Sequence, residues 1–377
     1  MLVLLTSPSA FFVNGNFVQP LVDALKQISA TGNPVAVVSN HDRPEWFDAC
    51  FSGSNVQFVR FEARQNGVVI GLIAANLKLK SYDVVVLAAS DDDLHMAKNG
   101  KALLVAAGWC TNPKVTRLGI RVANCAELVE VFNLTAGWMG HWWFEGANPL
   151  YSVKALLDLS TYGRDITQQI FGSKLTSVVK KGGSQLNALL TIASRSLLLD
   201  GIGDLEKLFW AVYPSSSSSN NGTDVLSDFT SRLRTSVSRV QFEKNSEPLF
   251  IRHTPALKRS TNKAVDRFDC SDQIATIHLN PKYKKQIVGR NVIVVDDCTT
   301  YGLSFAVASA FLRAAGANSV LGVALGKFGN NIYSFDIEIT SDPFQPVLAA
   351  GVISNGYTHL YGASNNKTQD VLKNLIA

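Results

Sequence analysis

Short apolar runs that alternate with amphipathic stretches are the feature that most constrains how this chain folds. In the N-terminal third the runs are Val3–Leu5, Val35–Val38, Val56–Phe61, Val84–Ala88 and Ala102–Ala106. Between the first two, apolar residues at 17, 18, 21, 22, 25 and 28 recur at helical spacing, which predicts a helix. Buried strands separated by helices are typical of a parallel sheet covered by helices, so the sequence predicts an α/β fold.

The second half of the chain repeats this rhythm. Strands are predicted at Leu208–Tyr213, Leu249–Ile251, Ala275–Leu279, Val292–Val295 and Val320–Leu325, and helices at Asp224–Ser238 and Ser304–Ala315. The stretch from Thr135 to Gly163 is less regular, holds three tryptophans and is expected to pack at a junction. Because 377 residues exceed one ordinary domain, we expect two domains, residues 1–140 and 141–377.

Composition and net charge indicate a folded protein and bear on whether its partner is a small anion or nucleic acid. Hydrophobic residues make up 46% and charged residues 17% of the chain, which indicates a folded protein with a core. The net charge is +5, and the densest basic cluster (Lys282, Lys284 and Lys285) is short enough to be a solvated face. A small anionic substrate therefore accounts for the charge at least as well as nucleic acid, and no dense basic run favours the latter.

The cysteines and the N-terminus bear on the compartment. The five cysteines are far apart and lack any CxxC spacing, so neither a disulfide framework nor a zinc site is expected, and a reducing cytoplasm fits best. The start, MLVLLTSPSAFFV, has no basic leader and is expected to form a buried strand rather than a signal peptide. No apolar run reaches the ~18–20 residues that cross a bilayer, so no membrane partner is expected.

The segment from residue 291 to 316 carries the clearest chemistry. Four β-branched residues, Val292–Val295, lead into two adjacent carboxylates, then a loop rich in hydroxyls, then a helix from about Ser304 to Gly316. Ligands of open α/β sheets bind beyond the carboxyl ends of strands, and a helix N-terminus attracts phosphate. Carboxylates repel phosphate but accept hydrogen bonds from sugar hydroxyls. The segment therefore predicts a cradle for ribose 5-phosphate.

This arrangement resembles the motif with which type I phosphoribosyltransferases bind phosphoribosyl pyrophosphate (PRPP). The resemblance implies a domain with a central parallel sheet that transfers 5-phosphoribose to a base-like or other small acceptor and releases pyrophosphate. It implies that Asp296 and Asp297 hold the ribose hydroxyls and Mg²⁺. The implied 5-phosphate ligands are Thr299, Thr300, Gly302 and Ser304. Either Tyr301 or Gly302 stands where the family usually has glycine, and relatives of this fold often form homodimers.

A second loop is expected for the pyrophosphate. Residues 208–223 read LFWAVYPSSSSSNNGT, with a predicted strand before the serines and a predicted helix after them. One interpretation is a flexible serine-rich linker. The other is a pyrophosphate loop at Tyr213–Ser219, in which Tyr213, Ser215, Ser216 and Ser217 bind the ligand. This loop lacks the lysine or arginine that many relatives have, so other residues must neutralise the charge.

A set of basic residues between 249 and 282 could supply that charge. They are Arg252, Lys258, Arg259, Lys263 and Arg267. The stretch is similar to the catalytic loop of the competence-protein (ComF-like) branch, in which such loops close over PRPP and exclude water. On this resemblance Arg252 and Arg267 are the residues expected to reach pyrophosphate.

The N-terminal third resembles a haloacid dehalogenase (HAD) domain, a Rossmann-like sandwich, that has lost its nucleophile. The family's first strand ends in two acids, whereas this chain has Thr6-Ser7-Pro8-Ser9, and Ser7 has no base beside it in the sequence. Ser39-Asn40 matches the family's phosphate-binding position, and Asp91–Asp93 matches its metal loop or, alternatively, an exposed helix cap. Lys78 or Lys80 would be the family lysine. Without the attacking aspartate, covalent phosphoryl transfer is not expected.

Three functions remain open at this point, and the first two belong to different classes. The first is a Mg²⁺-dependent phosphoribosyltransferase whose catalysis rests on positioning and electrostatics. The second is a non-catalytic regulatory protein that binds PRPP or a nucleotide, which the decayed HAD motif and the unusual serine loop favour. An active HAD phosphatase is the third and weakest hypothesis.

Overall fold

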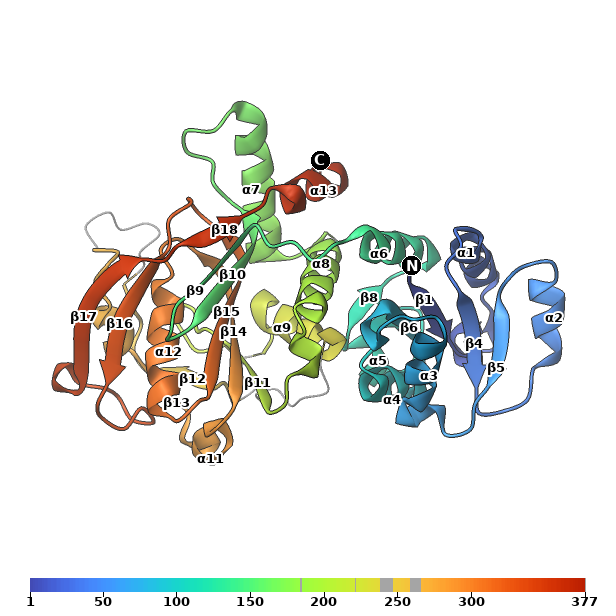
Figure 1. Ribbon diagram of the computed structural model, residues 1–377, viewed down its shortest axis with the longest axis horizontal. Helices are drawn as coiled ribbons and strands as arrows, with labels where there is room; N and C mark the ends of the chain where they lie inside the picture. The colour runs from blue at the N-terminus through green and yellow to red at the C-terminus, as the bar shows by residue number, and fades with distance from the viewer. Residues whose placement is uncertain (184, 221, 238–246, 258–265, 377) are drawn as a thin grey trace. The chain divides into compact units, whose positions relative to one another are not determined.

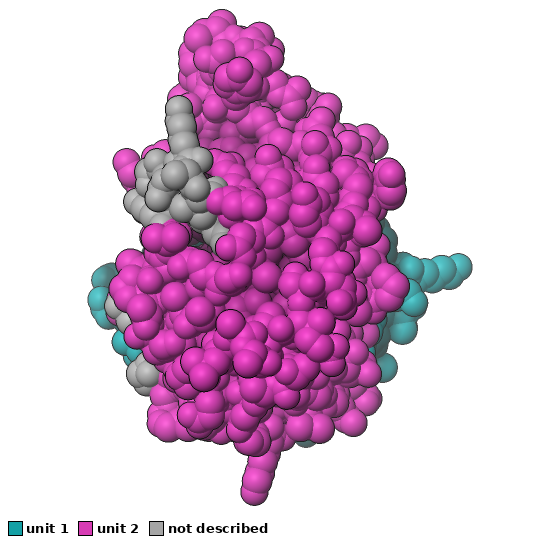
Figure 2. Space-filling view, turned by 90° about the vertical axis from the view of Figure 1, so that its left-hand side faces the viewer, with its two compact units in different colours: residues 1–140, 187–204, 231–239 teal, residues 141–186, 205–230, 240–377 magenta. Residues whose placement is uncertain are grey.

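The computed structural model describes residues 1–183, 185–220, 222–237, 247–257 and 266–376. The chain divides into two compact units (Figure 2). Unit 1 comprises residues 1–140, 187–204 and 231–239, and unit 2 comprises residues 141–186, 205–230 and 240–377. The division is therefore not a single cut at residue 140. Helix α8 (Leu186–Leu199) belongs almost wholly to unit 1, and α9 (Val225–Val237) contributes residues to both units.

Unit 1 is built on a six-stranded parallel sheet. Its strands, from edge to edge, are β5 (Gln57–Arg60), β4 (Val35–Ser39), β1 (Val3–Thr6), β6 (Val84–Ala88), β7 (Leu103–Ala107) and β8 (Ile120–Val122). The predicted strands are confirmed, with ends that shift by small amounts. All residues of β1, β4, β6 and β7 are buried, as expected for strands covered on both faces.

Helices cover both faces of this sheet (Figure 1). They are α1 (Gln19–Ala30), α2 (Glu45–Phe51), α3 (Val68–Asn76), α4 (Asp91–Gly100), α5 (Pro113–Thr116) and α6 (Cys125–Gly137). Helix α1 packs against α6, while α4 packs against α3 and α5 on the other face. The predicted first helix is confirmed, and Pro20 sits in its first turn, where a missing N–H costs nothing. A short hairpin, β2 (Phe12–Val13) and β3 (Asn16–Phe17), follows β1.

Unit 2 is built on a second six-stranded sheet. The strands, in order, are β11 (Leu208–Val212), β14 (Asn291–Thr299), β15 (Ser319–Lys327), β10 (Ser152–Asp158), β9 (Phe144–Ala147) and β18 (Gly362–Ser364). The first four run parallel, and β9 pairs antiparallel with both of its neighbours. Strand β14 is longer than predicted, because its pairing with β15 continues beyond Val295 to Thr299.

Two hairpins and several helices complete unit 2. The hairpins are β12 (Phe250–Arg252) with β13 (Ile277–Leu279), and β16 (Tyr333–Ile339) with β17 (Val352–His359). The helices are α7 (Ile166–Lys181), α10 (Ser271–Ala275), α11 (Lys284–Ile287), α12 (Leu303–Ala314) and α13 (Lys367–Ile376). Throughout the described residues of the chain, no helix is long and apolar enough to span a bilayer.

The expectation that the stretch from Thr135 to Gly163 is less regular is wrong for its second half. The segment contains the end of α6 and the strands β9 and β10, and β10 lies inside the sheet between β15 and β9. Strand β10 was missed because Ser152 and Lys154 interrupt its apolar pattern. The ammonium of Lys154 forms an ion pair with Glu145 of β9 at 3.3 Å, so a charged side chain is accommodated in the strand.

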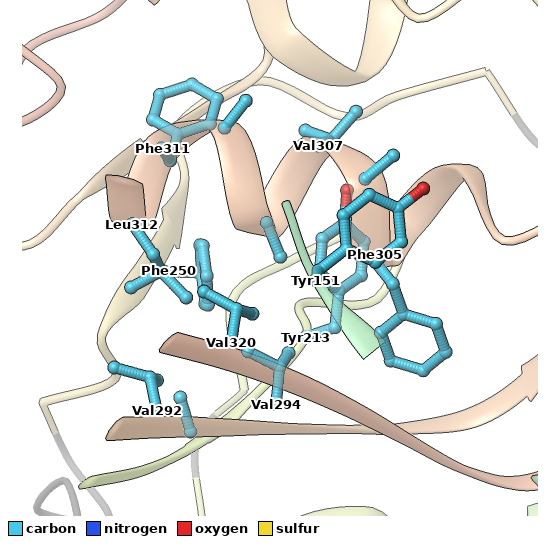
Figure 3. Packing of buried hydrophobic residues seen from close by; sticks show 14 of the residues in the cluster. Tyr151, Tyr213, Phe250, Val292, Val294, Phe305, Val307, Phe311, Leu312 and Val320 are labelled. Carbon is cyan, nitrogen blue, oxygen red and sulfur yellow. The ribbon is translucent and has the colours of Figure 1, made fainter. Parts of the chain in front are cut away.

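The core of unit 2 forms where α12 lies on β14 and β15. Figure 3 shows Phe305 and Leu312 on the side of the helix toward Val292, Val294 and Val320 of the two strands, whereas Val307 and Phe311 point to the opposite side. Helix and strands approach closely at Gly322 of β15, where an added Cβ would lie 2.5 Å from the Phe305 ring. This packing fixes the N-terminus of α12 beside the carboxyl end of β14, where the two predicted carboxylates are.

Candidate functional site

Two cavities lie at the carboxyl ends of β11 and β14 in unit 2. The first, of about 300 Å³, is lined among others by Tyr213, Ser215, Ser218, Ser219, Asp296 and Asp297. The second, of about 450 Å³, is lined among others by Arg267, Thr299, Thr300, Tyr301, Gly302 and Ser304. The predicted acids thus share one cavity with the serine loop, and the predicted phosphate ligands line the other. Lys180 lines both cavities.

The loop before α12 is shaped for an anion. Gly302 has φ = 86°, in the left-handed region that favours glycine, and its N–H donates to the Thr299 hydroxyl at 3.1 Å. Gly302 is also the N-cap of α12, and no side chain caps the first turn. The N–H of Phe305 donates to the Gly302 carbonyl, whereas the N–H groups of Leu303 and Ser304 and the positive end of the helix dipole are available to a phosphate. Of the two positions considered for the motif's glycine, Gly302 is the one whose backbone requires it.

The two acids differ in burial. Asp296 is 9% exposed, and one of its carboxylate oxygens accepts the N–H of Asp297 at 2.8 Å. Burial, followed by the neighbouring charge of Asp297, raises the pKa of Asp296 well above its ordinary value. Asp297 is half-buried and accepts the N–H of Cys298 at 2.6 Å. A ribose hydroxyl that donates to Asp296, or a cation beside it, would offset the unfavourable burial of this carboxylate.

Among the described residues, no third His, Cys, Asp or Glu lies beside the two acids as a further metal ligand. Across the described ranges, no group of three or more His, Cys, Asp or Glu side chains is placed to hold an ion. The nearby thiol of Cys298 is also unsuited, because burial raises its pKa. Two carboxylates combined with substrate phosphates are nevertheless the usual way in which proteins bind Mg²⁺. Asp296 and Asp297 therefore fit Mg²⁺ that arrives with a phosphorylated substrate.

The serine loop is ordered by its own polar groups. Ser215 Oγ accepts the N–H of Ser218 at 3.2 Å, and the Asn220 amide donates to the carbonyl of Tyr213 at 3.0 Å. The Tyr213 hydroxyl donates to Gln273 Oε1 at 2.7 Å, away from the serines. Ser216 and Ser217 are not among the residues that line either cavity. Ser218 and Ser219, which do line the smaller one, were not selected from the sequence.

Arg252 and Arg267 have different surroundings. The Arg252 side chain is buried, donates to the carbonyl of Ser215 and lies 2.6 Å from the Thr276 hydroxyl. The N–H of Arg252 donates to Ser219 Oγ at 2.8 Å, so this residue binds the serine loop to the β12–β13 hairpin. Arg267 lines the larger cavity. The other predicted bases, Lys258, Arg259 and Lys263, lie outside the described residues.

Lys180 is the functional candidate that sequence reasoning missed. It is exposed in the last turn of α7 and is the only residue common to the linings of the two described cavities. It brings a positive charge to the serine loop, which has none in its own sequence. Nothing local distinguishes Lys180 from Lys181, its neighbour on the helix, so only the packing of α7 identifies it.

Lys327, the last residue of β15, binds the loop before α12 and the loop after β15 through its ammonium. Its side chain is fully buried, and the carbonyl oxygens of Thr300, Phe328, Gly329 and Asn331 surround its ammonium within hydrogen-bond distance, so its three hydrogens have four acceptors. Burial lowers the pKa of Lys327 to about 7, while the charge of Asp158 acts in the opposite direction. Through Thr300, this ammonium positions the loop that precedes α12.

In unit 1, the residues at the end of β1 form a closed polar network. Ser7 and Asp93 are fully buried, and the Ser7 hydroxyl donates to Asp93 at 2.8 Å. Asp93 also accepts the N–H groups of Ala89 and Ser90 and forms a buried ion pair with Arg64. The partner of Ser7 is thus a carboxylate distant in sequence, and it is committed to Arg64 and the cap of α4. Asp93 is not part of an exposed run.

The other positions that the sequence suggested for a phosphatase-type site come together in part, around Arg64. Lys78 and Lys80 are exposed, so the cation beside the acids is Arg64 instead. Asn40 donates to Asp92 at 3.3 Å and accepts the N–H of Arg64 at 3.0 Å, while Asp91 pairs with Lys114 at 2.7 Å. Every acid of the run from 91 to 93 therefore has a polar or basic partner.

Comparisons with protein-family models, curated proteins and solved structures gave no match to this chain.

Proposed function

We propose that unit 2 is a Mg²⁺-dependent phosphoribosyltransferase of the type I fold, which moves 5-phosphoribose from PRPP to a small acceptor. The observation that carries the proposal is the pairing of two cavities that share Lys180. One has acids and serines on its walls, and the other has threonines and an open helix N-terminus. PRPP combines a sugar diol with phosphates at both ends, which is the chemistry these walls offer.

Each part of PRPP has a complementary wall. Thr299, Thr300, Ser304 and the first N–H groups of α12 bind the 5-phosphate. Asp296 and Asp297 accept hydrogen bonds from the ribose hydroxyls, and they are the residues that would hold a Mg²⁺ whose charge would offset that of the pyrophosphate. The serine loop binds that pyrophosphate through hydroxyl and N–H groups. Lys180 and Arg267 supply the positive charge, because the loop itself has none.

The reaction breaks the bond between ribose C1 and pyrophosphate and forms a bond from C1 to the acceptor nucleophile. The electron pair leaves with pyrophosphate, and the acceptor releases its proton to solvent. The sugar passes through a cationic transition state, which Asp296 and Asp297 stabilise by their negative charge. Tyr301 and Phe328 line the larger cavity, and Tyr301 stacks on Phe268 with ring centroids 4.9 Å apart. An aromatic wall of this kind favours a flat, base-like acceptor.

Calorimetry with PRPP, with and without Mg²⁺, tests the binding site. Wild type is expected to bind PRPP in a Mg²⁺-dependent manner, and the double variant Asp296→Asn/Asp297→Asn is expected to lose that dependence. Asp336→Asn is the matched control, because Asp336 is an exposed acid of β16 that contacts Asn355. Absence of PRPP binding by wild type, or equal binding by the double variant, would refute the site.

A screen for pyrophosphate release separates catalysis from binding alone. Pyrophosphate release that depends on one acceptor supports the transferase. Mg²⁺-dependent PRPP binding without release for any acceptor supports the alternative, a non-catalytic PRPP- or nucleotide-binding regulatory protein. The observation that favours this alternative is that Arg252, one of the bases expected at pyrophosphate, is buried and committed to the serine loop.

For unit 1 we propose a HAD-like sandwich that does not act as a phosphatase. Strand β1 ends at Thr6 and is followed by Ser7, so no carboxylate stands at this point. Asp93, the nearest acid, is already neutralised by Arg64. An active phosphatase would need a free acid at this point. Turnover of a generic phosphomonoester that the Asp93→Asn variant abolishes would contradict this proposal.

A further inference from the structure

We propose that His253 and His278 in unit 2 form a binding site for a late first-row divalent transition metal such as Ni²⁺ or Cu²⁺. The two imidazoles lie on the β12–β13 hairpin, and their Nδ1 atoms are 3.0 Å apart. Ring centroids are 5.1 Å apart, with the ring planes at 41°. Two ring nitrogens that face each other at this distance are placed to bind one ion together.

The backbone of the hairpin fixes this placement. His278 pairs directly with Ile251 across the two strands, and His253 follows two positions after Ile251. Side chains two positions apart on a strand share a face, so both histidines project from the same side. The N–H of His253 also donates to the carbonyl of Thr276 at 3.1 Å, which extends the pairing past the end of β12. The arrangement is therefore held before any ion binds.

The contacts of His253 set its tautomer. Its Nε2 lies 3.1 Å from the carbonyl oxygen of Ala275, and a carbonyl only accepts, so the hydrogen of a neutral His253 ring is on Nε2. The lone pair of Nδ1 then points to His278. A backbone carbonyl that orients one ring nitrogen is the usual outer-shell partner of a metal-binding histidine. Without metal, Nδ1–H of His278 donates to this lone pair, and a metal ion on Nδ1 would require the His278 ring hydrogen to be on Nε2 instead.

The separation of the nitrogens indicates the class of ion. With metal–nitrogen bonds of about 2.0–2.1 Å, nitrogens 3.0 Å apart give an angle of about 91–97° at the ion. That angle suits the tetragonal geometry of Ni²⁺ and Cu²⁺, which also bind imidazole more tightly than the earlier divalent ions. Mg²⁺ prefers oxygen ligands, so this site is distinct in chemistry from the acids of the candidate active site.

The remaining coordination positions belong to water or to a small anion. No third His, Cys, Asp or Glu completes a metal cluster among the residues that the structure describes. The site is thus a two-histidine chelate open to solvent on one side.

An ion at this site would hold in place the segment after β12 that is hydrogen-bonded to the serine loop. Arg252, next to His253, donates to Ser215 and Ser219, and the N–H of Ala256 donates to the carbonyl of Ser216 at 2.8 Å. The hairpin that carries the two histidines is thereby attached to the loop that lines the smaller cavity.

Calorimetric titration with NiCl₂ tests the proposal on the intact, untagged chain in a buffer without thiols or chelators. Wild type is expected to bind one Ni²⁺ at the hairpin. His253→Gln and His278→Gln are each expected to weaken that binding by at least about tenfold, because a single imidazole loses the advantage of chelation. His359→Gln changes another histidine of the same unit and is expected to leave binding unchanged.

The outcomes separate a metal site from a simple hydrogen bond between the rings. Equal Ni²⁺ binding by wild type and by the two hairpin variants would overturn the proposal, as would the absence of saturable binding by wild type. Because His253 is exposed, replacing it removes a ligand without opening the core, so this variant decides the question even if His278→Gln is unstable. The titration contains no PRPP, and its result is independent of the transferase proposal.

Discussion

Replacing Lys327 with methionine tests how much the burial of its ammonium changes the free energy of unfolding of unit 2 with pH. The side chain is fully buried, and its ammonium has carbonyl acceptors from Thr300, Phe328, Gly329 and Asn331. Methionine keeps much of the apolar stem and removes both the charge and its donors. The substitution therefore isolates the free energy that depends on protonating Lys327.

The sign of the pH effect follows from the direction of the shift. The pKa of Lys327 is lowered from 10.5 to about 7, so between these values the unfolded chain binds more protons than the folded chain. Stability then rises with pH in this window, since each pKa unit corresponds to about 1.4 kcal/mol. From pH 7 to pH 9, wild type is expected to gain about 2 kcal/mol in unfolding free energy relative to Lys327→Met.

Urea unfolding of both proteins at pH 7, 8 and 9 measures this difference. If the two units unfold in separate urea transitions, the transition whose midpoint changes in Lys327→Met is that of unit 2. Lys285→Met, at an exposed lysine of α11, is the control and should show no change in pH dependence relative to wild type. Parallel profiles for wild type and Lys327→Met would refute the reasoning. They would show that the carbonyl oxygens stabilise the ammonium as well as water does.

Two further predictions concern other charged groups. Arg64→Met should destabilise unit 1 by about 3–5 kcal/mol, because it leaves the buried carboxylate of Asp93 without its cation; the double variant with Asp93→Asn should recover part of the loss in urea unfolding. Lys180→Met should weaken PRPP binding by about tenfold, equivalent to about 1.4 kcal/mol, whereas Lys181→Met should not. Equal affinities of these two lysine variants in calorimetry would exclude the role assigned to Lys180.

The sequence by itself determined the elements whose cause is local. The run Val84–Ala88 forms a strand because its three valines favour extended backbone and all five apolar side chains can be buried. Helix α12 follows from apolar residues at helical spacing. The segment from Asp296 to Ser304 is continuous, so a strand, a turn at Gly302 and a helix bring its acids, hydroxyls and N–H groups to one end of the sheet.

Strand β10 shows where local patterns were insufficient. Lys154 belongs in the sheet only because Glu145 of β9 pairs with it, and the sequence of β10 alone does not show that partner. Arg252 is a similar case. Its sequence position suggested a ligand, whereas the structure buries its guanidinium against Ser215 and Thr276.

Only the tertiary structure decided which distant residues meet. Lys180 joins the serine loop through the packing of α7, Arg64 neutralises Asp93 across unit 1, and His253 faces His278 across a hairpin. The physical reason is that a local motif needs only the backbone preferences of neighbouring residues. A contact between distant segments depends on how all the elements of a unit bury their apolar faces together.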